Sequence, residues 1–135
     1  MVILRSVNIL GIGQAPKAVL PVFIAKAKLN QPLELSVNPN LPISYIDVRD
    51  LAQVIACILK HPKVSAVYNV AYPNVVTVEN LAKKVIAACH SSSKINITVP
   101  AVSVRSVGID CQRTWDDLGF KPRYDIDRII ENILS

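Results

Sequence analysis

The stretch Trp115-Asp-Asp-Leu-Gly-Phe-Lys-Pro-Arg-Tyr124 follows Asp110 and decides how this 135-residue chain is expected to fold. Asp110 predicts a helix start, because a short acidic side chain can accept hydrogen bonds from free backbone N–H groups. Gly119 predicts the end of that helix, and Pro122 predicts a break after it. Asp125 predicts the cap of a last helix, whose apolar stripe is Ile126, Ile129, Ile130, Ile133 and Leu134.

The composition is that of one folded domain over residues 1–135. Hydrophobic residues make up 51% of the chain, which is enough to bury a core and too apolar for disorder. Charges and prolines interrupt the apolar runs, so no run approaches the ~18 residues that cross a bilayer. The opening Met1–Arg5 segment lacks the basic flank and cleavage site of a signal peptide. We therefore expect a cytoplasmic protein without a membrane partner.

Charge and cysteine content indicate no nucleic-acid or metal chemistry. The net charge of +5 is spread along the chain, with Lys83-Lys84 as the one adjacent basic pair. A nucleic-acid surface needs clustered cations, so we expect no such partner, although some of these charges could contact an anionic cofactor or substrate. The three cysteines lack metal-ligand spacing and predict structural thiols in a reducing compartment: Cys57, Cys89 and Cys111.

Strands and helices alternate along the chain, which indicates an α/β protein. Residues 2–10 are apolar on both faces, as in a strand inside a parallel sheet. Further strands are expected at residues 33–37, 43–46, 66–71 and 95–99.

Helices are expected between these strands. Pro16 suits a first helical turn, and Pro21 predicts that the helix begins or bends there. Asp47 and Thr77 are expected to cap the next two helices, and His61-Pro62 is expected to end the first of them. The expected core faces are Val19, Leu20, Phe23, Ile24 and Ala27, then Leu51, Val54, Ile55, Ile58 and Leu59, then Val78, Leu81, Ala82, Val85 and Cys89.

Four motifs together resemble the extended short-chain dehydrogenase/reductases, the NAD-dependent epimerase/dehydratase family. In chain order they are Arg5-Ser-Val-Asn8 with Gly11-Ile-Gly13-Gln14, Tyr45-Ile-Asp-Val-Arg-Asp50-Leu-Ala, Tyr68-Asn69-Val70, and the closing segment from Asp110. The resemblance covers almost the whole chain. It implies the C-terminal part of an enzyme similar to the UDP-glucose 4-epimerase-like proteins. That part is a partial Rossmann-like edge, formed by the first strand, plus a small α/β substrate-binding domain.

Two features of the family are missing from this sequence. Gly11-Ile-Gly13 has neither a third glycine nor an acidic residue ending a second strand, so it does not match a cofactor-binding turn. No tyrosine has a lysine four residues later, the pair with which the family exchanges a proton while NAD or NADP takes or gives hydride. We therefore expect no catalytic residue in this chain, an absent NAD(P)-binding region, and no tight cofactor binding by the chain alone.

The resemblance assigns binding roles to a few residues. Ser6 and Val7 correspond to backbone beside the nicotinamide and are candidate cofactor contacts. Asn8 corresponds to an asparagine that contacts a substrate diphosphate, and a polar side chain in an apolar strand also needs a partner of its own. A ligand contact and a structural role are therefore equally open for Asn8. Arg105 is a second candidate substrate contact, with a surface charge as the alternative.

Other positions depart from the family's diphosphate site. Val37 and Ser36 replace a glycine and an aromatic residue, while Ile43 and Pro100 stand near the places of two arginines. Guanidinium groups are natural phosphate ligands, so their loss weakens the case for a nucleotide-sugar substrate. The alternatives are a small or hydrophobic carbonyl substrate, or a truncated binding module without catalysis.

Two further expectations concern packing. Arg49 and Asp50 are expected to pair at a helix start, and Trp115 is expected to anchor the tail. The first strand should be left solitary and exposed, a state that invites pairing with another chain. We therefore predict a homo-oligomer, a swapped arrangement, or association with an N-terminal half.

Overall fold

The computed structural model describes residues 1–61, 65–105 and 108–135. Strands and helices alternate through these residues, so the predicted α/β class is confirmed. The elements are β1 (Val2–Ser6), β2 (Asn8–Leu10), α1 (Val19–Lys28), β3 (Leu33–Leu35), β4 (Pro42–Ile43), β5 (Tyr45–Asp47), α2 (Val48–Lys60), β6 (Ala66–Val70), β7 (Val76–Thr77), α3 (Val78–Ala88), β8 (Ile95–Ile97), α4 (Gln112–Leu118) and α5 (Ile126–Leu134).

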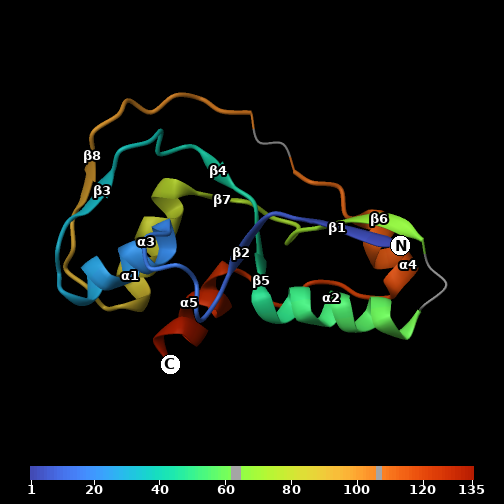
Figure 1. The fold of residues 1–135 in the computed structure, drawn as a ribbon. Helices are drawn as coiled ribbons and strands as arrows, with labels where there is room; N and C mark the ends of the chain where they lie inside the picture. The colour runs from blue at the N-terminus through green and yellow to red at the C-terminus, as the bar shows by residue number, and fades with distance from the viewer. Residues whose placement is uncertain (62–64, 106–107) are drawn as a thin grey trace.

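The elements gather in two lobes with a strand pair between them (Figure 1). The three-helix lobe contains α1, α3 and α5, together with the β3–β8 and β4–β7 pairs. The strand lobe contains the β1–β6 pair with α2 and α4. The β2–β5 pair runs between the lobes, so the chain enters the strand lobe first and then crosses to the three-helix lobe.

The expected continuous strand over residues 2–10 is wrong, because the chain changes partners at Val7. β1 pairs in parallel with β6, and β2 pairs in parallel with β5. The first strand is therefore not solitary. Its two faces are also only partly covered, with Ile3 43% exposed. Residues 43–46 divide in the same way at Ser44, since β4 pairs antiparallel with β7 while β5 pairs with β2.

Most of the predicted helix ends are confirmed. The side chains of Asp47, Thr77 and Asp125 accept backbone N–H bonds at the starts of α2, α3 and α5. Gly119 ends α4 with φ of 61°, a left-handed conformation that glycine adopts without a steric penalty. Asp110 accepts the N–H of Gln112 at 2.9 Å, but the helix begins only at Gln112.

Several element boundaries differ from the expectation. α1 begins at Val19, so Pro16 lies before the helix, and Pro21 lies in the first turn, where its missing N–H costs nothing. β3 ends at Leu35 rather than at residue 37. α2 ends at Lys60, and Pro62 lies outside the described residues.

The apolar face expected for α2 is broader than the face that is buried. Val54 is buried, and Leu51 and Ile58 pack against the smaller core. Ile55 and Leu59 are 43% and 75% exposed, because the strand lobe covers only one side of the helix.

Two apolar clusters form the core, one in each lobe. The larger cluster joins the stripes of α1, α3 and α5, including Leu20, Val85 and Ile130, each fully buried. The smaller cluster lies between β6, α2 and α4 around Tyr68. Successive residues of β5 enter different clusters, since Tyr45 belongs to the larger and Ile46 to the smaller.

The tail connects the two clusters. Leu118 and Phe120 pack in the smaller cluster, and Ile126 and Ile129 pack in the larger one. Trp115 is half-buried. Among the described helices, none has the length and hydropathy that a membrane crossing requires.

Candidate functional site

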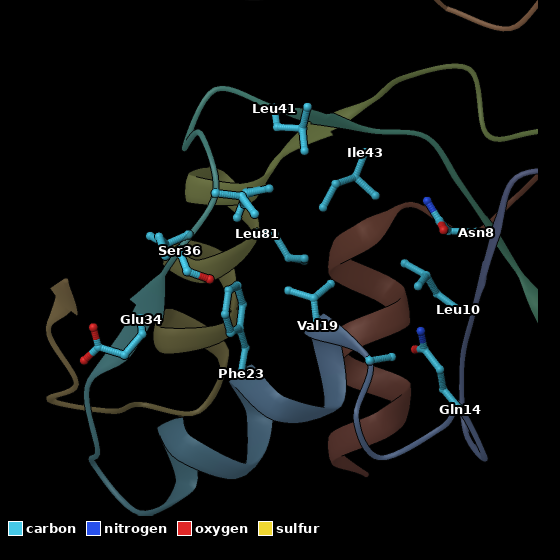
Figure 2. A pocket seen from close by; sticks show the side chains of 14 residues that line it. Asn8, Leu10, Gln14, Val19, Phe23, Glu34, Ser36, Leu41, Ile43 and Leu81 are labelled. Atoms are coloured by element: carbon cyan, nitrogen blue, oxygen red, sulfur yellow. The ribbon is translucent and has the colours of Figure 1, made fainter. Parts of the chain in front are cut away.

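The candidate site is a cavity of about 390 Å³ in the three-helix lobe (Figure 2). It opens between β2 and the loop after it, α1, the β3 end, β4 and the first turns of α3. This volume lies in the lower part of the range of small-molecule sites, roughly 300–1,000 Å³. The cavity therefore has room for a small ligand.

Apolar side chains form most of the cavity wall. Phe23 of α1, Leu35 of β3 and Leu81 of α3 are 4%, 1% and 1% exposed, so they are fixed by the core behind them. Figure 2 shows Phe23, Val19 and Leu81 grouped around the hollow, with Leu41 and Ile43 above them. The helical stripes that build the core thus also build the wall of the site.

Two amide side chains lie along one side of the cavity, on β2 and the loop that follows it. Asn8 Nδ2 donates to the carbonyl oxygen of Ser44 at 3.0 Å, which ties β2 to the break between β4 and β5. Asn8 also lines the cavity, so its structural bond and a ligand contact are compatible. The ligand contact stays a prediction.

Gln14 is the second amide, and sequence reasoning did not single it out as a site residue. Its Oε1 is buried and has no hydrogen-bond partner. Gly11 begins the loop that leads to Gln14. Its φ is 149°, and a Cβ added to Gly11 would lie 2.6 Å from Val48 Cγ1. The sequence signal that could have identified Gln14 is its position in the Gly11-Ile-Gly13-Gln14 motif.

Three of the four positions that depart from the resembled diphosphate site line this cavity: Ser36, Val37 and Ile43. Pro100 does not line it. Glu34 lines the cavity as well, but its carboxylate accepts a 2.8 Å bond from Asn96 and points away from the hollow in Figure 2. None of the described residues that line the cavity is a lysine or an arginine.

The remaining predicted site residues lie outside the cavity. Ser6 is exposed at the end of β1, and the Val7 N–H donates to Val70 at 3.4 Å. Arg105 is exposed in the segment between β8 and α4. Of the four predicted contacts, the structure brings only Asn8 to the cavity wall.

The expected Arg49–Asp50 pair is wrong. Arg49 instead pairs with Asp47 at 2.8 Å, and hydrogen bonding to Asp47 raises the pKa of Arg49. Asp50 is fully buried and accepts the N–H groups of Arg123 and Tyr124 at 2.9 and 3.0 Å. Burial raises the pKa of Asp50 from its ordinary value, although these two hydrogen bonds act in the opposite direction.

The buried Tyr45 also has a structural role. Its hydroxyl oxygen accepts the Ile126 N–H at 3.1 Å, and its ring stacks on Tyr72 with centroids 5.3 Å apart. Burial raises the pKa of Tyr45, which disfavours the phenolate. Within the described parts of the chain, no group of three or more His, Cys, Asp and Glu residues could hold a metal ion.

A protein-family model matches just over half of the chain. The family described as the NAD dependent epimerase/dehydratase family matches residues 1–71. The matched region runs from β1 through β6 and contributes all the lining residues of the cavity except Val78 and Leu81.

Individual relatives are longer than this chain. It is 22% identical over 136 residues to dTDP-4-dehydro-6-deoxyglucose reductase of Escherichia coli, covering 98% of this chain and 43% of the relative. RMD of Pseudomonas aeruginosa, solved with NADPH, superposes with a TM-score of 0.84 at 24% identity over 98% of this chain and 46% of that one. UDP-N-acetylglucosamine 4-epimerase of Bacillus cereus superposes with a TM-score of 0.83 at 19% identity, over 98% of this chain and 44% of that one. The chain thus spans less than half the length of these relatives and shares their fold, including the Rossmann-like edge.

Proposed function

The chain belongs to the NAD dependent epimerase/dehydratase family, and we propose that it is the substrate-binding part of an NAD(P)-dependent enzyme of that family. The cavity between β2, α1 and α3 carries this proposal, because it is a concave, mostly apolar site with two convergent amides. The reaction class is hydride transfer at a secondary alcohol or carbonyl carbon. It would serve epimerisation, dehydration or reduction of a nucleotide sugar or another small hydroxyl or carbonyl compound.

The end of β1 fits a role beside the cofactor. β1 and β6 run in parallel and end together at Ser6 and Val70, and ligands of α/β proteins bind outside the carboxyl ends of such strands. Ser6 is exposed there, so the backbone of Ser6 and Val7 would border the nicotinamide. NAD or NADP, when bound, accepts or supplies the hydride.

Asn8 links the two parts of the proposed site. It directly follows Val7 and lines the cavity, so it would hold a substrate hydroxyl or carbonyl oxygen close to the cofactor edge. Arg105 would contact only the part of a substrate that extends beyond the cavity, since its side chain is exposed and does not line it.

A binding module without catalysis is the second candidate. Glu34 is the only titratable side chain among the described residues that line the cavity, and its carboxylate is bonded to Asn96. This wall can bind and orient a ligand, but it supplies no general acid or base.

Association with another chain is part of the proposal. Among the described residues the β1–β6 sheet has two strands, and no third strand pairs with either edge. Sedimentation velocity of the 135-residue chain should therefore show a dimer or larger species. A monomer at high concentration would contradict this.

The proposed site can be tested by nuclear magnetic resonance of the ¹⁵N-labelled chain, titrated with small alcohols, ketones, sugars and nucleotide sugars. At least one class should shift the amides of Leu10, Phe23 and Leu81. Val19→Trp, which fills the cavity from a 38% exposed position, should abolish these shifts. Val67→Trp, at a 37% exposed position of β6, is the matched control. Shifts elsewhere only, or submicromolar NADH binding by this chain, would contradict the proposal.

A further inference from the structure

We infer that the cavity selects an uncharged, mainly apolar molecule that presents one hydroxyl or N–H donor to the β2 side of the wall. This inference rests on the proposed function, because it specifies the substrate class of the same site. It follows from the charge of the wall, from the burial of its apolar side chains, and from the position of one unpaired acceptor.

The wall has no side chain that could neutralise an anionic ligand. The described lining residues include no lysine or arginine, and Asn8 commits one of its two amide N–H groups to Ser44. A diphosphate needs cationic or multiple N–H partners when water is removed from it. The cavity therefore offers poor compensation for a buried phosphate.

The N-termini of α1 and α3 are both positively polarised features of the wall, but that of α3 is capped by Thr77, whose side chain accepts the Asn80 N–H. Ala18 and Val19 line the cavity at the start of α1, and Ala18 supplies no side-chain cap. A helix end carries only about half of an elementary charge, and Pro21 removes one N–H from the first turn of α1. These ends can orient a neutral dipole, but they cannot balance the charges of a diphosphate.

The inner part of the apolar wall is held in place by the core. Phe23, Leu35 and Leu81 are nearly fully buried, so their positions are set by packing in the larger core. Ile43 and Leu41 extend this surface above them (Figure 2). An alkyl or ring group placed here would leave water for a preformed apolar surface.

The polar side of the wall contains an acceptor that lacks a donor. Gln14 Oε1 is buried without a partner, and leaving such an atom unpaired is costly. Figure 2 shows Gln14 and Asn8 on the same side of the hollow, with Leu10 between them. A ligand O–H or N–H would pair with Gln14 Oε1 while the rest of the ligand faces Phe23 and Leu81.

Three probes test this inference on the full 135-residue chain. They are 4-tert-butylcyclohexanol, which is neutral and has one donor, 4-tert-butylcyclohexanone, which has the same carbon skeleton but no donor, and UDP, which carries a diphosphate. Amide shifts of Leu10, Phe23 and Leu81 report binding in the cavity. The dissociation constant of the alcohol should be at least tenfold lower than that of UDP and severalfold lower than that of the ketone.

Variants separate the charge of the wall from its donor preference. Ile43→Arg places a cation in the wall and should reverse the order, so that UDP binds at least tenfold more tightly than before and the alcohol binds more weakly. Leu59→Arg adds the same charge at an exposed site on α2 and should change neither constant. Gln14→Met keeps the side-chain length without the acceptor and should remove the difference between alcohol and ketone.

The outcomes distinguish failure of the inferred ligand class from failure of the proposed site. Stronger UDP binding than alcohol binding by the unaltered chain, with shifts in the cavity, would overturn the inference and leave the proposed function standing. Equal binding of alcohol and ketone would overturn the donor assignment to Gln14. If no probe shifts the cavity amides while the spectrum is that of a folded protein, both the inference and the proposed site fail.

Discussion

The three-helix lobe has a larger apolar cluster than the strand lobe, although the same tail closes both. In the three-helix lobe, α5 contributes Ile126, Ile129 and Ile130 to a continuous apolar cluster. α5 also makes polar contacts, because Lys84 pairs with Asp127 at 2.7 Å and the Ile126 N–H donates to the Tyr45 hydroxyl at 3.1 Å. In the strand lobe, α4 contacts β6 through two side-chain hydrogen bonds. Thr114 Oγ1 donates to the Asn69 carbonyl at 2.6 Å, and the Tyr68 hydroxyl donates to Asp117 at 3.1 Å.

This difference follows from what each lobe can bury. Three helical stripes face one another in the three-helix lobe, so apolar burial is extensive there. The strand lobe has one strand pair with partly exposed apolar residues, including Ile3 and Val67 at 43% and 37%. Specific hydrogen bonds then decide where the tail docks on it. The two lobes should accordingly respond to different substitutions.

The largest effect is expected from a cavity in the three-helix lobe. Leu20→Ala removes a side chain that is 0% exposed and should lower the free energy of unfolding by about 3 kcal/mol. Urea unfolding followed by circular dichroism measures this loss. Leu59→Ala, at a 75% exposed position of α2, should change stability by less than about 0.5 kcal/mol. Equal losses would contradict the stabilising role of Leu20 in the larger cluster.

The next effect concerns the buried carboxylate that holds the tail between the lobes. Asp50→Ala leaves the N–H groups of Arg123 and Tyr124 without their acceptor and should cost about 2 kcal/mol at neutral pH. The exposed Asp116, replaced by alanine, is the control.

The pH dependence of the Asp50→Ala effect has a definite sign. Because burial raises the pKa of Asp50, the folded state holds its proton to higher pH than the unfolded state does. Stability from this group is fully present below the ordinary carboxyl pKa and is lost as pH rises through the folded pKa. The stability difference between the unaltered chain and the variant should therefore grow as pH falls below neutrality. A difference that shrinks on acidification would contradict the raised pKa.

A smaller effect is expected at the polar contact of α4. Thr114→Val keeps the shape of a side chain that is 2% exposed but leaves the Asn69 carbonyl without its donor. Unfolding free energy should fall by about 1.5 kcal/mol. Thr98→Val removes a comparable bond to Leu35 at an exposed position and should cost less. The reverse order would mean that the strand lobe does not depend on this bond.

The smallest effect is expected at the turn between α4 and α5. Gly119→Ala forces a side chain into a left-handed conformation and should cost about 1 kcal/mol, although nothing lies within 4 Å of the added Cβ. Gly108→Ala has the same open space without the positive φ and should be nearly neutral. Thermal unfolding of both variants measures the difference. Identical unfolding temperatures for the two variants would contradict a conformational cost of alanine at position 119.

Sequence patterns predicted the parts of the fold that depend on local chemistry. The caps at Asp47, Thr77 and Asp125 and the stop at Gly119 need only neighbouring residues. The partner change at Val7 was not predictable, because an apolar run has the same composition whichever strand it pairs with. Asp50 was misassigned for a related reason, since its partners lie 73 and 74 residues away in the chain.

Some residues of the candidate site were identified from the sequence, and others became apparent only in the structure. Family resemblance led to residues that line the cavity, Asn8, Ser36, Val37 and Ile43, and to others that do not, Ser6, Val7, Pro100 and Arg105. Gln14 was not identified as a site residue, because its unpaired Oε1 becomes apparent only once the loop has been placed against the cavity. The binding roles of Ser6, Val7, Asn8 and Arg105 remain predictions.

Side chains of β5 alternate between the two cores, which limits insertions and deletions in this part of the chain. Tyr45 and Ile46 are neighbours in sequence, yet they belong to different cores. Inserting or deleting one residue just before them would exchange their faces and send each side chain into the wrong lobe. Substitutions in this segment can be compensated by repacking, but a change of length cannot. Relatives of this chain should therefore vary in residue type here while keeping the same number of residues between β4 and α2.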